Sequence, residues 1–155
     1  MRTQAIISLT AALLLLLTAT SAAHAATPKA CELLDAKTAA SLAGSAVGAP
    51  ADVQGVGCFY TTKSGSATVG LTMADAPANA GSDVTRAMKM ASPGATTESI
   101  PDLGDQNLLI VRTSNQNGLM VVYHHKTLSL AVQQRMTPDL KAAMIKAMRQ
   151  IMSKL

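Results

Sequence analysis

LLIVRTSNQNGLMVVYHHKTLSLAVQ, residues 108–133, is the stretch of sequence that decides the fold. Apolar and β-branched residues fill three short runs in it, 108–112, 119–124 and 127–133, and few residues separate one run from the next. Such runs are typical of strands. Asn117-Gly118, between the first two runs, is a strong signal for a tight hairpin turn. The stretch therefore predicts an antiparallel meander of strands.

A helix is expected to follow this meander and to close the chain. Thr137 is a suitable N-cap, Pro138 suits the first helical position, and Asp139 favours the positive end of the helix dipole. The apolar residues beyond them recur at helical spacing: Leu140, Met144, Ala147, Met148, Ile151 and Leu155. This periodicity predicts an amphipathic helix that packs on the sheet.

Before the meander, local signals predict two helices and a hairpin. Asp35 and Gly44 suit the N-cap and C-cap of a helix over residues 36–43, and a Gly/Ala/Pro-rich loop is expected over 45–57. Alternation predicts a hairpin of strands over 58–73. A second helix is expected from Ser82 or Asp83 to about Ala91. The predicted fold class is α+β, in the order α-β-β-α-β-β-β-α, with an antiparallel sheet of about five strands and helices mainly on one face.

The first 25 residues have the three parts of a cleaved secretory signal peptide. Arg2 gives a positive start, an apolar core extends over residues 5–17, and small residues end in Ala23-His24-Ala25. This core is shorter than the roughly 17 to 25 residues that span a membrane, so we expect cleavage and no stable membrane anchor. Cys31 lies too far beyond Ala25 for lipid attachment. The expected product, 26–155, is a single periplasmic or secreted domain.

Two cysteines, Cys31 and Cys58, fall in this mature chain. After export both thiols meet an oxidising compartment, where a disulfide between them is the expected state. A reactive thiol or redox pair is the alternative, but the sequence lacks the Cys-x-x-Cys spacing that tunes such pairs. We therefore predict a Cys31–Cys58 disulfide.

Charge and aromatic content argue against nucleic-acid binding. The chain has 13 basic and 9 acidic residues, and one of the basic residues, Arg2, leaves with the signal peptide. The remaining basic residues are scattered apart from the C-terminal segment. Only Phe59, Tyr60 and Tyr123 remain as aromatic side chains, which is few for a protein that stacks on bases.

His124-His125 and three methionines, Met144, Met148 and Met152, raise the possibility of a copper site. Thioether and imidazole ligands select copper. Methionine at helical spacing is more often core filling, however, especially where Phe and Trp are scarce. Neighbouring residues on a strand also point to opposite faces. We therefore predict no metal site and no cofactor, and keep a periplasmic copper-binding protein as an alternative.

Asp102 and Asp105 are two carboxylates close together in the sequence, as acid–base catalysis can require. Beside Pro101 and Gly104, however, they are more simply interpreted as turn residues. No nucleophile motif is present, so no catalytic residue is predicted, and a cryptic hydrolase is a second alternative.

The closing helix carries Lys141, Lys146, Arg149 and Lys154. These residues would suit an anionic membrane surface, although the helix is also needed to cover the sheet.

Several short segments carry a family resemblance: Ala30-Cys31-Glu32-Leu33-Leu34, Leu42-Ala43-Gly44, Gly57-Cys58-Phe59-Tyr60 and Ile100-Pro101-Asp102-Leu103-Gly104-Asp105. With them the chain resembles a family of small exported domains of unknown function, best known as actinobacterial cell-envelope lipoproteins. The resemblance implies a Cys31–Cys58 bridge and a PsbP-like fold, whose members are mostly non-enzymatic. The lipid-attachment cysteine of that family is missing here. We therefore expect a non-enzymatic binding or accessory protein with an unknown protein or small-molecule partner in the cell envelope.

Overall fold

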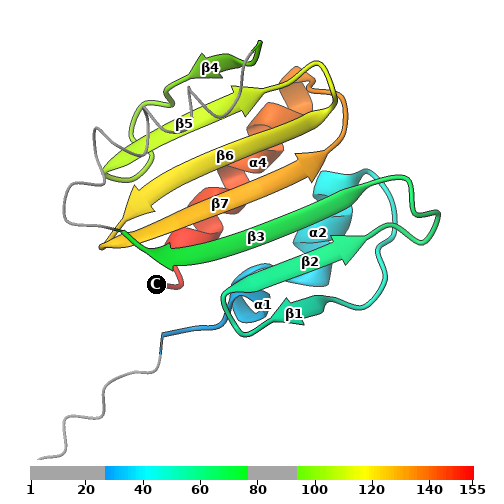
Figure 1. Cartoon of the computed structure of the whole chain (residues 1–155), viewed down its shortest axis with the longest axis horizontal. Coiled ribbons are helices and arrows are strands. Elements are labelled where there is room, and N and C mark those ends of the chain that lie inside the picture. The colour runs from blue at the N-terminus through cyan, green and yellow to red at the C-terminus, as the bar shows by residue number, and fades with distance from the viewer. Residues whose placement is uncertain (1–26, 77–93) are drawn as a thin grey trace, which may run out of the picture.

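The computed structural model describes residues 27–76 and 94–155, which form a sheet covered on one face by helices (Figure 1). The predicted signal peptide, 1–25, and the predicted helix from Ser82 or Asp83 to Ala91 lie outside these residues. The helices are α1 (Ala30–Leu33), α2 (Ala36–Ala43) and α4 (Pro138–Met152). The strands are β1 (Ala51–Val53), β2 (Gly57–Thr61), β3 (Thr68–Asp75), β4 (Thr96–Glu98), β5 (Gln106–Val111), β6 (Gln116–Tyr123) and β7 (Lys126–Gln133).

The α+β fold class is confirmed, but the expected number of strands and the order of elements are wrong. The sheet has seven antiparallel strands in the order β1-β2-β3-β7-β6-β5-β4. The two strands that were not predicted are β1, inside the expected loop 45–57, and β4. Both have three exposed residues and lie at the edges of the sheet, so they carry no alternation of apolar and polar residues. Helix α1 is also additional to the prediction.

The first hairpin of the meander is present, and its turn lies at the start of the turn predicted over 114–118 rather than at the Asn117-Gly118 pair. Asn117 and Gly118 lie within β6, and the chain turns at Asn115, whose φ is 60° and whose N–H donates to the Arg112 carbonyl at 3.2 Å. Asn117 is buried: its Oδ1 accepts from the Arg112 N–H at 3.1 Å, and its Nδ2 donates to the Gln134 carbonyl at 2.5 Å. The asparagine thus satisfies backbone groups at the end of the sheet.

The predicted helix caps are confirmed. The Asp35 carboxylate accepts from the Thr38 N–H at 2.7 Å, and this hydrogen bond is the main cause of its lowered pKa. Gly44 ends α2 with φ at 66°, a conformation that glycine adopts without strain. Thr137 caps α4 by accepting from the Leu140 N–H at 3.1 Å.

The core lies between the sheet and the helices. Its largest fully buried side chains come from all three helices or their flanks and from alternate strand positions, and include Leu34, Leu42, Leu71, Leu119, Leu128, Leu130, Met144, Met148 and Ile151. Tyr60 reaches this layer and donates its hydroxyl hydrogen to the Leu34 carbonyl at 3.0 Å, while burial raises its pKa. Met144 and Met148 of α4 therefore fill the core, as one of the two interpretations of their spacing expected.

The Cys31–Cys58 disulfide is present, with 5.0 Å between the two Cα atoms. It joins α1 to β2 and so ties the N-terminal helix to the sheet. Within residues 27–76 and 94–155, no helix is both long and apolar enough to cross a membrane.

Candidate functional site

The second face of the sheet, which we call the open face, is turned away from α1, α2 and α4 and toward the viewer in Figure 1. Because strand residues alternate between faces, every second position belongs to it. These positions are Ala51, Val53, Gly57, Phe59, Thr61, Thr68, Gly70, Thr72, Ala74, Thr97, Gln106, Leu108, Ile110, Gln116, Gly118, Met120, Val122, Thr127, Ser129, Ala131 and Gln133. None of these strand positions holds an ionisable side chain.

One row of residues crosses the middle of the open face. The strand register pairs Phe59 with Gly70, Gly70 with Ala131, Ala131 with Gly118, and Gly118 with Ile110. The three central members are the smallest residues available, whereas a phenylalanine and an isoleucine stand at the two ends. Gly70, Ala131 and Gly118 therefore form a low part of the sheet surface, which we call the floor, and the larger apolar side chains of Phe59 and Ile110 stand at its two ends.

The two glycines of this row differ in what lies over them. A Cβ atom at Gly70 would stand 2.5 Å from the Phe59 ring, so the ring already occupies that space. At Gly118, by contrast, a Cβ atom would meet no atom of the described chain within 4 Å. The floor is thus covered by Phe59 on the β3 side and open on the β6 side.

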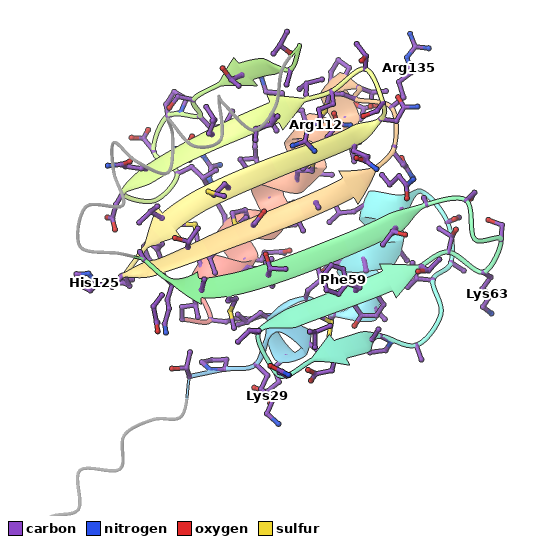
Figure 2. The ribbon with its side chains drawn as sticks, in the orientation of Figure 1. Lys29, Phe59, Lys63, Arg112, His125 and Arg135 are labelled. Carbon is purple, nitrogen blue, oxygen red and sulfur yellow. A yellow bond between two sulfur atoms is a disulfide. The ribbon has the colours of Figure 1, made fainter. Side chains whose placement is uncertain are left out.

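A groove of about 370 Å³ lies over this floor. Met120 and Ser129 line it from the neighbouring row, where they pair with each other across β6 and β7. Arg112, Gln116 and Gln133 lie at one end of the groove, and Figure 2 shows Phe59 and Arg112 on the same side of the sheet. The groove offers an aromatic ring, a thioether, hydroxyls and amides along its length, and the Arg112 guanidinium at one end. These groups suit an uncharged, mainly apolar guest with a few hydrogen-bonding atoms.

Charged pairs lie elsewhere in the described chain. Lys126 and Asp75 occupy positions of the helix-covered side at the ends of β7 and β3, with 2.5 Å between Nζ and Oδ1. Hydrogen bonding to Lys126 and its charge lower the pKa of Asp75. Glu98 of β4 pairs with Lys141 of α4 at 2.6 Å. These ion pairs therefore lie away from the groove, and Arg112 is the one charged side chain among the described residues that line it.

His124 and His125 form the two-residue turn between β6 and β7, with φ angles of 47° and 61°. The His124 ring packs edge-on against Tyr123, with ring centroids 4.0 Å apart. The strand predicted over 119–124 therefore ends one residue earlier, at Tyr123, and His124 joins His125 in the turn. Met144 and Met148 are fully buried in the core, and Met152 packs against it. Within the part of the chain that the structure describes, no three His, Cys, Asp or Glu side chains gather as a metal site would require.

Asp102 and Asp105 lie in the connection between β4 and β5, as predicted. Asn107 holds this connection: its side chain accepts from the Ile100 N–H at 2.6 Å and donates to the carbonyls of Ile100 and Leu103 at 2.8 Å. The Asp105 N–H donates to the Val122 carbonyl at 2.8 Å. The two aspartates are thus residues of a well-anchored turn.

The basic residues of the closing helix do not border an exposed apolar surface, which binding to a membrane would require. The apolar side of the helix, including Leu140 and Met144, is buried against the sheet, so it is not available for insertion into a membrane. Lys141 pairs with Glu98, while Lys146, Arg149 and Lys154 lie on the outer part of the helix layer.

Sequence reasoning missed the residues that make the groove. Gly70 and Ala131 were placed in strands without any further role, and Gly118 was assigned to a turn. A glycine inside a strand pattern often marks a close approach of another group, and this signal was present at Gly70 and Gly118. Comparison with known proteins found no matching family model, no matching curated protein and no matching solved structure. The functional inference therefore depends on the geometry of the groove.

Proposed function

We propose that this chain is a small exported, non-enzymatic binding protein whose groove on the open face holds an uncharged, mainly apolar group of its partner. The observation that carries the proposal is the space over Gly118, which no atom of the described residues fills and which lies in the row between Phe59 and Ile110. A guest there can contact the strand backbone directly, because glycine places no side chain in the way.

The composition of the open face supports the same proposal. A sheet face that meets only water usually carries polar and charged residues at alternate positions. Here those positions hold Gly, Ala, Thr, Ser, Gln and a few apolar residues, without a charge among the described strands. Such a face can lose its water to a partner without the cost of desolvating an ion.

A binding role is favoured over catalysis by the side chains that line the groove. Within the described chain these residues include no His, Asp, Glu or Cys. The Ser129 hydroxyl therefore has no base in the groove to activate it as a nucleophile. The Cys31–Cys58 bridge and the α+β architecture are features that the family of small exported domains implies, and they support export and membership of that family as parts of this proposal.

The test is a ligand-observed NMR screen of neutral aromatic and aliphatic fragments, followed by mapping of the hits on backbone amides. We expect hits to shift the amides of Gly70, Gly118 and Ala131. Gly118→Leu fills the groove and should abolish these shifts. Gly48→Leu adds the same side chain outside the groove, where a Cβ atom would meet only the Thr61 carbonyl at 3.7 Å, and should leave them unchanged. Hits that map elsewhere, or that persist in Gly118→Leu, would refute the proposal.

A further inference from the structure

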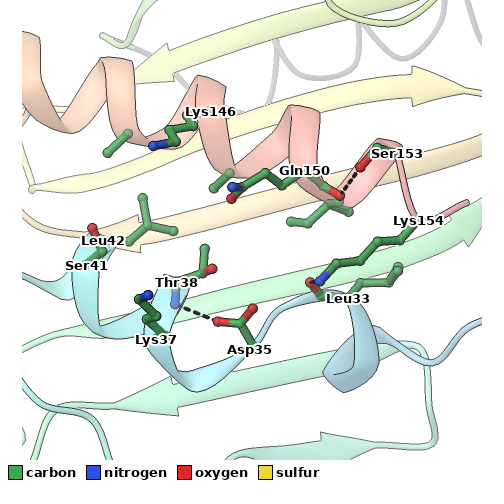
Figure 3. A pocket seen from close by; sticks show the side chains of 13 residues that line it. Leu33, Asp35, Lys37, Thr38, Ser41, Leu42, Lys146, Gln150, Ser153 and Lys154 are labelled. Carbon is green, nitrogen blue, oxygen red and sulfur yellow. Dashed lines mark hydrogen bonds between the residues drawn. The ribbon is translucent and has the colours of Figure 1, made fainter.

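A second groove lies in the helix layer, between α2 and α4, on the side of the sheet opposite the first (Figure 3). Its volume is about 500 Å³. Its deepest residues are apolar members of the core, Leu33, Leu42, Ala147 and Ile151. Above them the lining changes to lysines, hydroxyls and an amide. This second groove, which three lysines line, therefore differs in chemistry from the groove of the open face, where Arg112 is the one charged residue of the described lining.

Three ammonium groups line the groove and come from both of its sides. Figure 3 shows Lys37 on α2 and Lys146 on α4, with Lys154 extending from the end of α4. Lys154 donates from Nζ to the Leu33 carbonyl at 3.0 Å, which holds its charge across the groove. The cations thus converge from two elements that are far apart in the sequence.

Asp35 is the one carboxylate among the described residues of the lining. It is held by its hydrogen bond to the Thr38 N–H, which with the nearby charge of Lys154 keeps its pKa low. The two ion pairs found in the described chain, Lys126–Asp75 and Lys141–Glu98, involve neither Lys37 nor Lys146. Three positive charges therefore face a single negative charge, and the groove carries an excess of positive charge.

Neutral hydrogen-bond donors accompany these cations. Thr38 and Ser41 on α2 face the groove together with Gln150 on α4. A phosphate group has three strong acceptor oxygens and a charge of about −1.5 to −2, so it is matched by several ammonium groups and hydroxyls together. The groove is also larger than one phosphate, which leaves room for the organic part of an ester.

We propose that the groove between α2 and α4 binds the phosphate group of a phosphate ester through Lys37, Lys146 and Lys154. This site is independent of the groove on the open face, because the sheet separates the two. One site can fail its test without affecting the other. If both exist, the protein holds a phosphate-bearing envelope component on its helix side and an uncharged partner on its sheet side.

The primary test is an NMR titration of the disulfide-bonded protein with glycerol 3-phosphate. Saturable shifts are expected at the amides of Thr38, Ser41 and Gln150. Lys37→Gln/Lys146→Gln should weaken binding by roughly tenfold or more, since each variant removes a charged hydrogen-bond donor. The matched control, Lys63→Gln/Arg135→Gln (both labelled in Figure 2), removes the same charge from two residues that do not line the groove and should change binding less than about twofold.

A parallel arm distinguishes a free ester from a lipid headgroup. Sedimentation with phosphatidylglycerol vesicles, in wild type and in both double variants, shows whether a phosphate in a membrane reaches the same lysines. Binding of glycerol 3-phosphate alone assigns a free ester, and vesicle binding that is lost only in Lys37→Gln/Lys146→Gln assigns a headgroup. The proposal is overturned if neither probe binds, or if the two double variants weaken binding equally, which would indicate general attraction to positive charge.

Discussion

The two faces of the sheet are built from the same strands but have different side chains. On the helix-covered face, β7 presents Leu128, Leu130 and Val132, all fully buried in the core. On the open face the alternate residues of the same strand are Thr127, Ser129, Ala131 and Gln133. On β7 the buried residues lie on one face only, whereas on β5 the open-face residues Leu108 and Ile110 are also buried. The small, uncharged side chains at the β7 positions of the other face fit the partner that we propose for the groove.

Truncating one side chain on each face should give the largest contrast. Leu130→Ala empties a fully buried position and should lower the free energy of unfolding by about 2 to 5 kcal/mol. Met120→Ala removes a half-buried side chain from the groove and should cost about 1 kcal/mol or less while weakening fragment binding. Urea unfolding of both variants provides the measurement. Equal losses of stability would mean that the open face is also core.

The disulfide is expected to have the next largest effect, because it fixes the helix-covered face to α1. Cys31→Ala/Cys58→Ala should lower the free energy of unfolding by about 3 kcal/mol, since the bridge closes a loop with a sequence separation of 27 residues. For wild type, urea unfolding with and without reductant measures the same contribution of the disulfide to the free energy of unfolding. The fragment-binding groove should persist in the folded variant, because neither cysteine lines it. A change in stability below about 1 kcal/mol would contradict a structural role for the bridge.

Within the open face, the two glycines should respond in opposite directions. Gly70→Ala forces the Phe59 ring from its place and should destabilise the protein by about 1 to 3 kcal/mol. Gly118→Ala enters open space and should stabilise it by about 0.5 to 1 kcal/mol, because alanine loses less backbone entropy than glycine in a strand. Thermal unfolding of the two variants and of wild type shows whether each substitution lowers or raises the stability as expected. If Gly118→Ala is the more damaging change, the space over Gly118 is not free.

The parts of this structure that the sequence predicted are those set by local chemistry. Asp35 and Gly44 mark the ends of α2 because a cap needs only its nearest neighbours. The interpretation of Asn117-Gly118 as a turn was wrong because a buried asparagine can hydrogen-bond to backbone groups from within a strand. The floor of the groove was not predictable in this way, since Gly70, Gly118 and Ala131 become neighbours only through the register of three strands. The same holds for Lys37 and Lys146, which meet only when α2 and α4 pack together.

The smallest predicted effect is a pH dependence confined to the helix side of the sheet. The pKa of Asp35 lies below its ordinary value of 3.8, mainly because the folded state supplies the Thr38 N–H to the carboxylate. The stability from this contact is therefore present above pH 3.8 and is lost as the pH falls through the lowered pKa. Asp35→Ala should cost about 1 kcal/mol at neutral pH, and Asp35→Asn should retain most of the cap but lose this pH dependence.

Hydrogen exchange followed by NMR between pH 5 and pH 2 locates the effect. Protection of the α2 amides should fall with acid in wild type and stay level in Asp35→Asn. The amides of Gly118 and Ala131 should follow only global unfolding, since the open-face strand positions hold no group that titrates. If acid instead exposed Gly118 and Ala131 before α2, an ionisable group would have to act on the open face. The conclusion that no titratable group acts on the open face would then be wrong.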